Sequence, residues 1–366
     1  MKEISPARSL VIFATLVVAL LGLTLVVNWL VDPLQFYRRA SYLPEFSLQA
    51  RYQNPGLARN YPYDAVIIGS SVSLGFKAQM VHDQLGWNVL NLAMSGASAH
   101  EQSLLLQVAL RTGRVRHVLW DINHEFTGGD PHWVSEFDGA FPAYFYDPNP
   151  WNEIPNYLLN VDTAKASARV LLRRCGVPLA RPPSLADVSR PGHDHALGID
   201  GVLADWRRDH VIPPVFQQHP NDFTLEKLDR SFDENCIRLI AAHPEVQFEL
   251  WFPPFTIARQ AKLSEIPSVW DNMFLWKADA MRAVAPYSNA RLYDFQDDPN
   301  TVHGLEHYND CLHFDDTMRM RILQAVEKHS SLATPESLAN TEAQVRREAP
   351  MFRAAHPVNG KLPGVE

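Results

Sequence analysis

Short apolar runs alternate with helix-like segments through most of this chain. The first run, residues 65–68, is rich in β-branched residues and lacks polar alternation, which is typical of a strand covered on both faces. Four further apolar runs follow it along the chain, at residues 87–94, 115–123, 246–252 and 290–295.

Helical patterns lie between these runs and after the last of them. They occupy residues 101–111, 225–239, 269–284 and 315–328. Strands that alternate with helices form parallel sheets. The pattern therefore predicts an α/β domain over residues 63–330, built on a parallel sheet of about five strands.

Residues 125–222 interrupt that rhythm. They hold twelve of the 27 prolines, many aromatic residues and one clear helical segment near residues 157–173. Long irregular segments in compact enzymes often form lids or binding loops. We expect an insertion that either contacts substrate or packs over a helix or a partner surface.

The amino-terminal pattern is of a different kind. Residues 10–27 are uncharged and mostly Leu, Val and Ala, with Lys2 and Arg8 before them and Trp29 after them. About 18 residues at ~1.5 Å per residue span ~27 Å, which matches a hydrocarbon core. The run is longer than the apolar region of a cleaved signal peptide. We therefore predict a short segment, residues 1–9, and then one uncleaved membrane helix over residues 10–30.

The flanking segments complete the predicted organisation. Residues 31–62 are mixed in composition and are interpreted as a linker to the domain, whereas the polar, proline-interrupted residues 331–366 predict a peripheral or disordered tail. A short amino terminus before a large folded domain usually leaves that domain across the membrane. We expect a single-pass inner-membrane protein with its large domain on the extracytoplasmic, periplasmic side.

Composition narrows the classes of partner. The net charge of -8 and a pI near 6.0 offer no general basic surface for phosphates, so a nucleic-acid partner is not expected. Cys175, Cys236 and Cys311 lie far apart and contain no Cys-x-x-Cys pair, so neither a zinc knuckle nor a disulfide scaffold is indicated. The sequence leaves open whether two of these cysteines form a disulfide.

Cofactor and metal motifs are weak. The glycines after residue 68 fit neither the P-loop nor the dinucleotide-binding spacing. His193-Asp194-His195, and His303 with His307, lack a third ligand at a recognisable spacing. The sequence therefore predicts no cofactor and no metal.

The first apolar run stops abruptly at Gly69-Ser70-Ser71. Residues directly after a parallel strand lie at the carboxyl edge of the sheet, where α/β proteins bind ligands. Gly69 allows a sharp turn there, so Ser71 is the candidate nucleophile. Serine also caps helices and fills turns, which makes the motif alone weak support for catalysis.

A serine nucleophile needs a histidine base that is oriented by a carboxylate. Asp310 and His313 follow the last predicted strand and precede the last helix, at the edge where Ser71 is expected. Asp121 and His124 have the same spacing, but they lie at the end of a strand, where residues three apart point to opposite faces. We therefore predict that His313 hydrogen-bonds Ser71 and that Asp310 contacts the other ring nitrogen of His313.

An oxyanion hole requires hydrogen-bond donors near the nucleophile. Gly96, in the turn after the second run, can offer its backbone N–H, and Asn123, which ends the third run, can offer a side-chain amide. The Ser71 N–H is a third candidate donor.

In chain order these segments resemble the four blocks of the SGNH (GDSL-like) hydrolase superfamily. The matching positions are Gly69-Ser70-Ser71, Gly96, Asn123 and Asp310-x-x-His313, so the resemblance covers about residues 60–330. Ser70 stands where the family usually has Asp, and Asp121-Ile122-Asn123-His124 stands where it usually has Gly-x-Asn-Asp. With the predicted membrane helix, the chain resembles envelope proteins such as the accessory proteins of alginate O-acetylation.

The resemblance implies a three-layer, flavodoxin-like fold and serine-dependent acyl transfer on a cell-envelope or exported polysaccharide. An esterase of the same fold and a non-catalytic assembly component of a polysaccharide export complex remain alternatives. The implied partners are an acylated or acceptor glycan and a membrane-bound O-acyltransferase or export complex. The aromatic insertion could stack sugar rings.

Overall fold

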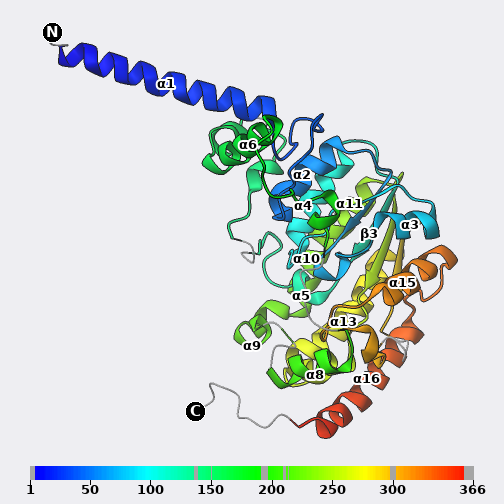
Figure 1. The fold of residues 1–366 in the computed structure, drawn as a ribbon. Coiled ribbons are helices and arrows are strands. Elements are labelled where there is room, and N and C mark those ends of the chain that lie inside the picture. Colours follow the sequence, from blue (N-terminus) through cyan, green and yellow to red (C-terminus); the bar gives the residue numbers. More distant parts are fainter. Residues whose placement is uncertain are drawn as a thin grey trace. The chain divides into compact units, whose positions relative to one another are not determined.

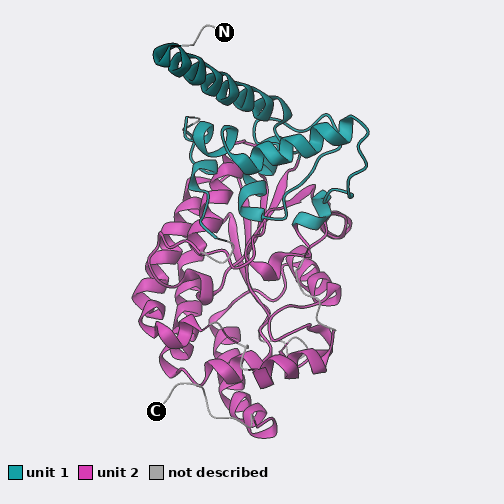
Figure 2. Cartoon of the chain, turned by 60° about the vertical axis from the view of Figure 1, so that its left-hand side comes forward, with its two compact units in different colours: residues 1–62, 138–188 teal, residues 63–137, 189–366 magenta. Residues whose placement is uncertain are grey.

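A computed structural model describes residues 5–135, 139–149, 151–190, 197–208, 212, 214–296 and 302–357. The chain divides into two compact units, shown in separate colours in Figure 2. Unit 1 comprises residues 1–62 and 138–188, and unit 2 comprises residues 63–137 and 189–366. Each unit is described by itself below.

Unit 2 is built on a five-stranded sheet whose strand order is β2-β1-β3-β4-β5. All four strand pairs are parallel. This is the doubly wound, flavodoxin-like order, and the predicted fold class is confirmed. The strands are β1 (Ala65–Ile68), β2 (Val89–Asn91), β3 (His117–Asp121), β4 (Gln247–Phe252) and β5 (Ala290–Asp294).

Helices complete three layers around this sheet (Figure 1). Helix α3 (Ala78–Leu85) packs with α15 (Asp316–Lys328), whereas α10 (Leu225–Phe232) packs with both α4 (Ala99–Leu110) and α13 (Pro267–Val284). The remaining helical segments of this unit are η1 (Ser71–Ser73), α5 (His124–Thr127), α8 (Ile199–Arg208), α9 (Val215–Gln218), η4 (Pro220–Phe223), η5 (Asp233–Ile237), α11 (Arg238–Ala242), α12 (Ile257–Leu263), η6 (Leu305–His307) and α16 (Pro335–Ala355).

The apolar runs form strands because both faces of the sheet are covered. All four residues of β1 are buried, and so are Trp120 on β3 and Trp251 on β4. The Trp120 indole N–H donates to Gln102 Oε1 of α4 at 2.7 Å, which satisfies its polar atom inside the core. The burial of these strands explains why their sequences show so little alternation.

The interpretation of residues 331–366 as a peripheral or disordered tail is wrong for most of that segment. Residues 335–355 form the 21-residue helix α16, which packs against α12 and α13. Thr334 caps its start, and Leu338, Val345 and Ala349 are buried along one side. Pro350 lies within this helix on its exposed side. Residues 358–366 lie outside the described part of the chain.

The interpretation of residues 31–62 as a linker is also wrong, because these residues belong to folded unit 1. Helix α2 (Ala50–Asn60) is buried over most of its length, including the polar Arg51, Gln53 and Asn54. Its partners come from residues 34–47 and from the predicted insertion, of which residues 138–188 belong to unit 1. The other helical segments of this unit are α1 (Pro6–Val31), η2 (Ala143–Phe145), η3 (Ile154–Leu158), α6 (Val161–Arg174) and α7 (Leu185–Val188).

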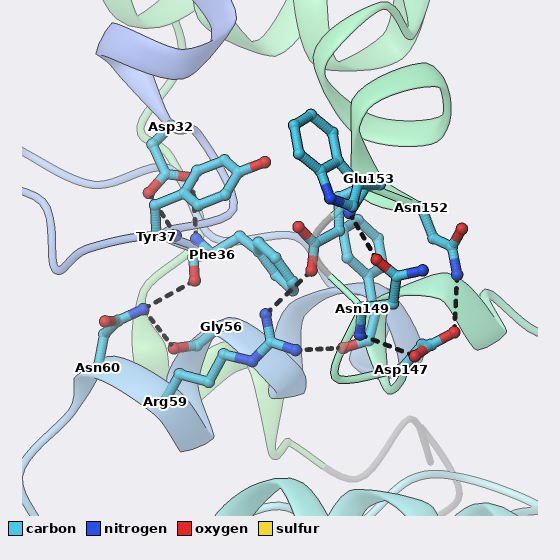
Figure 3. Close-up of polar contacts among 12 residues, drawn as sticks. Asp32, Phe36, Tyr37, Gly56, Arg59, Asn60, Asp147, Asn149, Asn152 and Glu153 are labelled. Atoms are coloured by element: carbon cyan, nitrogen blue, oxygen red, sulfur yellow. Dashed lines mark hydrogen bonds and ion pairs between the residues drawn. The ribbon is translucent and has the colours of Figure 1, made fainter.

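Polar contacts tie these two stretches together inside unit 1 (Figure 3). The Arg59 guanidinium donates to Phe145 O at 3.0 Å, lies 3.5 Å from Glu153 Oε1 and covers the Phe36 ring at 4.0 Å. The Asn60 amide donates to Gln35 O, Phe36 O and Gly56 O. Side chains that satisfy backbone carbonyls in this way are costly to lose, so residues 31–62 are held in one conformation.

Helix α1 is 26 residues long and contains an 18-residue stretch with a mean hydropathy of 2.9, so it is long and apolar enough to cross a membrane. Its apolar side chains from Leu10 to Val26 are exposed over much of their surface. Near its end the helix contacts the rest of unit 1, where Asn28 is buried and donates to Leu158 O at 2.8 Å. Within the described residues, no other part of the protein covers this exposed apolar surface.

Candidate active site

Ser71 lies directly after β1, at the carboxyl edge of the sheet, where it begins the short helix η1. The chain turns at Gly69, whose φ is +152°. A Cβ atom at this position would lie 2.1 Å from Asp121 Oδ2, so the turn demands glycine for both conformation and space. Ser71 retains 9% of its surface exposed, whereas Ser70 is fully buried.

Asp121, at the end of β3, fixes this turn. Its carboxylate accepts hydrogen bonds from Ser70 N at 2.9 Å and from Ser73 Oγ at 2.6 Å, and it lies 3.3 Å from Ser70 Oγ. Burial raises the pKa of Asp121 to about 6, against the effect of these three hydrogen bonds. The Asp121 carboxylate, which the sequence pattern offers only as half of a rival Asp-x-x-His pair, therefore positions the candidate nucleophile.

Ser71, His313 and Asp310 form a continuous hydrogen-bonded chain. His313 Nε2 lies 2.8 Å from Ser71 Oγ, and His313 Nδ1 lies 2.6 Å from Asp310 Oδ2. These are the two contacts that the spacing of the sequence led us to expect. The arrangement orients an imidazole to take a proton from a serine hydroxyl, which is the chemistry of serine acyl transfer.

The surroundings of the Asp310 carboxylate favour its ionised form. Its burial favours the neutral acid, but hydrogen bonds from the His313 ring and from the backbone N–H groups of Leu312 and His313 outweigh that effect and lower its pKa to about 2. An ionised Asp310 can stabilise the positive charge that His313 acquires when it takes the serine proton.

The loop that carries Asp310 and His313 is anchored to the end of β4. Tyr308 donates its hydroxyl to Pro254 O at 2.7 Å, and Thr256 donates its hydroxyl to Cys311 O at 2.8 Å. Thr256 also caps α12 through Arg259 N. These buried bonds hold the histidine on a rigid support, which a site of this kind requires.

The three candidate oxyanion donors all lie in turns after neighbouring strands. Ser71 begins η1, where the first N–H groups lack a partner within the helix. Gly96 adopts a φ of +61°, and its turn is tied to the nucleophile turn by the Met94 N to Gly69 O bond of 3.0 Å. Asn123 caps α5 by accepting a bond from Glu125 N through its Oδ1, which leaves its amide N–H₂ group for a ligand. Their joint action on an oxyanion stays a prediction.

His124 is not placed to replace His313. Its ring stacks on Phe216 at 5.2 Å between ring centroids, and burial first, then the charges of Arg259 and Lys277, lower its pKa to about 3. A neutral, fully buried imidazole beside an aromatic ring serves packing. Asp121 contacts Ser70 and Ser73 instead, so the two residues that share the Asp-x-x-His spacing serve different parts of the structure.

The other candidate ligands also have ordinary partners. His303 Nε2 lies 2.6 Å from Glu348 Oε2, and His307 Nδ1 lies 3.0 Å from Asp315 Oδ2. Within the described residues no group of three His, Cys, Asp or Glu side chains could hold a metal ion. His193, Asp194 and His195 lie outside those residues. All three cysteines are free thiols.

A buried ion pair that the sequence pattern does not reveal lies beside the site. Arg259 on α12 pairs with Glu125 on α5, and both side chains are more than nine-tenths buried. Burial raises the pKa of Glu125, while the charge of Arg259 and then that of His313 lower it. The sequence shows Glu125 two residues after the third predicted strand, but it does not reveal the partner, Arg259, which lies 134 residues further along the chain.

Gly69→Ala should damage both stability and activity. The added Cβ meets Asp121 at 2.1 Å and the left-handed backbone disfavours any side chain, so we expect a loss of about 2–4 kcal/mol in the free energy of unfolding. Urea denaturation measures the loss. Gly86→Ala, at a φ of +74° with nothing within 4 Å of the new Cβ, is the control for the backbone term alone. Equal losses in the two variants would contradict the proposed role of Asp121.

The raised pKa of Asp121 predicts a pH effect on stability. A carboxyl group whose pKa is higher in the folded state contributes stability below its unfolded pKa of 3.8, and this contribution is lost as the pH rises through about 6. About two pKa units correspond to at most ~3 kcal/mol. The free energy of unfolding of wild type relative to Asp121→Asn should therefore fall between pH 4 and pH 7, as measured by urea denaturation at both values. A constant difference would show that Asp121 is not perturbed.

No protein-family model matches this chain, and no curated protein matches it. Among solved structures, one from Streptococcus pneumonia, provisionally described as a platelet activating factor, is similar with a TM-score of 0.39 and 10% sequence identity; the match covers 76% of this chain and 89% of the other. A similarity of this degree carries no functional argument. The fold class rests on the strand order and the site on its geometry.

Proposed function

We propose that this protein is a serine-dependent acyltransferase of the SGNH type, which acts on a cell-envelope or exported polysaccharide through an acyl-enzyme on Ser71. One observation carries the proposal, the hydrogen-bonded chain Ser71–His313–Asp310 at 2.8 Å and 2.6 Å. The order of the sequence blocks and the flavodoxin-like strand order support it.

In the first half of the reaction, Ser71 Oγ attacks the carbonyl carbon of an acyl ester while His313 Nε2 takes the hydroxyl proton. Asp310 stabilises the resulting imidazolium. The N–H groups of Ser71 and Gly96 and the Asn123 amide are the proposed donors to the oxyanion. His313 then returns the proton to the leaving alcohol, and the acyl group remains on Ser71.

In the second half, a hydroxyl group attacks the carbonyl carbon of the acyl-enzyme while His313 takes its proton. The bond between the acyl group and Ser71 Oγ then breaks, and His313 returns the proton to Ser71 Oγ. A sugar hydroxyl gives an O-acylated glycan and makes the protein a transferase, whereas water gives a carboxylic acid and makes it an esterase. We favour the transferase on the resemblance to polysaccharide O-acetylation proteins. The alternative is an esterase, which the same geometry also supports.

The choice between water and a sugar hydroxyl as acceptor of the acyl group tests this proposal. The full chain in detergent is incubated with p-nitrophenyl acetate, with and without neutral oligosaccharides, and products are measured by mass spectrometry. A transferase yields acetylated oligosaccharide at the expense of acetate, and an esterase yields acetate alone. Folded protein that releases no p-nitrophenol and forms no acyl-enzyme would favour a non-catalytic assembly component.

Helix α1 supports a place at the membrane for this reaction. We propose that it anchors the chain once in the inner membrane, with the Ser71 site on the periplasmic side. The acceptor glycan, and a membrane-bound O-acyltransferase or export complex that delivers the acyl group, are then the proposed partners.

The proposed topology predicts the behaviour of fusions after Glu366. Alkaline phosphatase, which folds only outside the cytoplasm, should be active when fused there, and green fluorescent protein exported by the same route should be dark. A fusion to Ala40 is the control for the helix alone. Strong fluorescence and no phosphatase activity would place the domain in the cytoplasm, and a mature amino terminus near residue 30 would show a cleaved signal peptide.

A further inference from the structure

Unit 1 contains a cavity of about 410 Å³, a size that suits a small-molecule or oligosaccharide segment. We infer that this cavity is a binding site for a neutral, hydroxyl-rich sugar. Its walls come from the two segments predicted as linker and insertion. The lining residues used below are Ser47, Tyr52, Tyr144, Phe145, Asn156 and Asn160.

One wall of the cavity is aromatic. Tyr144 and Phe145 lie 4.6 Å apart between ring centroids, and Tyr52 meets Phe145 edge-on at 6.1 Å. Phe145 is buried, whereas the two tyrosines are half-buried and keep part of each ring open. Such rings present an apolar face with a polar tip, which matches the apolar face and equatorial hydroxyls of a pyranose.

Polar side chains that also line the cavity can donate and accept hydrogen bonds. Asn160 caps α6 through its Oδ1, which accepts from Asp162 N at 2.8 Å and leaves its N–H₂ group for a ligand. Asn156 donates its amide to Asn152 O at 2.9 Å and leaves its Oδ1. Burial first, and then the neighbouring Tyr52, raise the pKa of Tyr144 to about 12, so its phenol remains a donor. Sugar hydroxyls need this mixture of donors and acceptors.

The charges around the cavity favour a neutral ligand over a phosphate. Arg169 lines the cavity, but its Nε pairs with Glu45, which also lies 3.0 Å from Arg173 Nη1. Asp162 is 2.9 Å from Lys165 Nζ. Each charge that reaches the cavity is therefore already matched by an opposite charge. A phosphate site instead needs cations that remain available for the ligand.

The aromatic wall is held in place before any ligand binds. Arg59 fixes the backbone of Phe145 by donating to its carbonyl at 3.0 Å, and the guanidinium lies 3.5 Å from Glu153 (Figure 3). In the same view Asp147 accepts from the Asn152 amide at 2.7 Å and from Asn149 N at 2.8 Å. A preformed wall lowers the entropy cost of binding. This matters for a sugar, because its small apolar surface contributes little binding free energy to offset that cost.

The place of the cavity limits the source of the sugar. Pro33 and Leu34, which follow α1 directly, are part of its lining. Where α1 spans a membrane, the cavity lies within a few residues of the membrane surface. The same sugar chemistry is available there from a polysaccharide strand or from the head group of a glycolipid, and the test separates these two sources.

The test uses the full chain in nanodiscs of phosphatidylcholine. Binding of maltotriose, cellotriose and chitotriose is measured by saturation-transfer NMR, and a second set of nanodiscs contains a neutral glucosyl-diacylglycerol. We expect at least one of these sugars to bind and Tyr144→Ala to weaken it at least about tenfold, which corresponds to about 1.4 kcal/mol. Asn156→Ala, at an exposed position, is the second variant and should also weaken binding.

Trp151→Ala, an aromatic change in the same unit but outside the cavity lining, should leave sugar binding unchanged. Ser71→Ala should also bind sugar normally, because binding in this cavity does not depend on the chemistry proposed for Ser71. A failure of the sugar site is thus distinguished from a failure of the proposed acyl transfer. Binding to the trisaccharides and binding to the glycolipid alone both support the site. The inference is overturned when none of these sugars binds, or when Tyr144→Ala and Asn156→Ala bind as wild type.

Discussion

Ser71→Ala should reduce turnover of p-nitrophenyl acetate by on the order of 10⁴-fold or more, because it removes the atom that forms the acyl-enzyme. His313→Ala should have an effect of similar size, since nucleophile and base act as one unit and their losses do not add. Steady-state kinetics of the full chain measure both. The thermal unfolding midpoint should stay close to that of wild type.

Ser70→Ala is the matched control, one residue away on the same turn. Ser70 is fully buried, and its side chain reaches Asp121 only at 3.3 Å, so its loss should cost little activity. The Ser70 N–H, which makes the shorter bond to Asp121, is retained in the variant. An inactive Ser70→Ala beside an active Ser71→Ala would show that the turn presents the other hydroxyl.

Asp310→Asn should lower kcat by about 10⁴-fold. A carboxylate at 2.6 Å from His313 Nδ1 requires the ring to carry its proton on that nitrogen, which leaves Nε2 free to accept from Ser71. An asparagine can present a donor instead and favour the opposite tautomer, and it has no charge to stabilise the imidazolium. Kinetics and nitrogen NMR of the imidazole measure the two consequences.

Asp315→Asn is the control for this change, because Asp315 pairs with His307 at 3.0 Å on the same loop and also caps α15. Asparagine is a good capping residue, so this variant should keep both its fold and its activity. A loss of activity in Asp315→Asn as large as that in Asp310→Asn would mean that the loop, and not the Asp310 charge, supports the reaction.

The sheet and the triad could be predicted because their signals are local. Buried parallel strands appear as apolar runs, and residues directly after such strands must meet at one edge of the sheet. Ser71 directly follows β1, whereas His313, 242 residues later, lies in the loop between β5 and α15. The alternative pair, Asp121 and His124, was set aside on the argument that strand side chains alternate, but β3 ends at Asp121 and His124 begins helix α5. The contacts of Asp121 with Ser70 and Ser73 were not foreseen.

Unit 1 could not be predicted because its stabilising contacts are polar and distant in sequence. Arg59 meets Phe145 and Glu153 across more than 80 residues, and its buried helix α2 has an unfavourable composition for a core. Helix α16 was missed for a related reason, since its few buried residues are separated by charged ones and followed by Pro350. Hydrophobic patterning does not reveal segments of this kind.

Labelling with a fluorophosphonate tests the central claim most directly. Such probes react with serines that an adjacent base activates, so peptide mass spectrometry of the labelled full chain should find the phosphonate on Ser71. Ser71→Ala and His313→Ala should remain unlabelled, and Ser70→Ala should be labelled as wild type is. Folded wild-type protein that takes up no probe, or takes it up at a serine other than Ser71, would contradict the account.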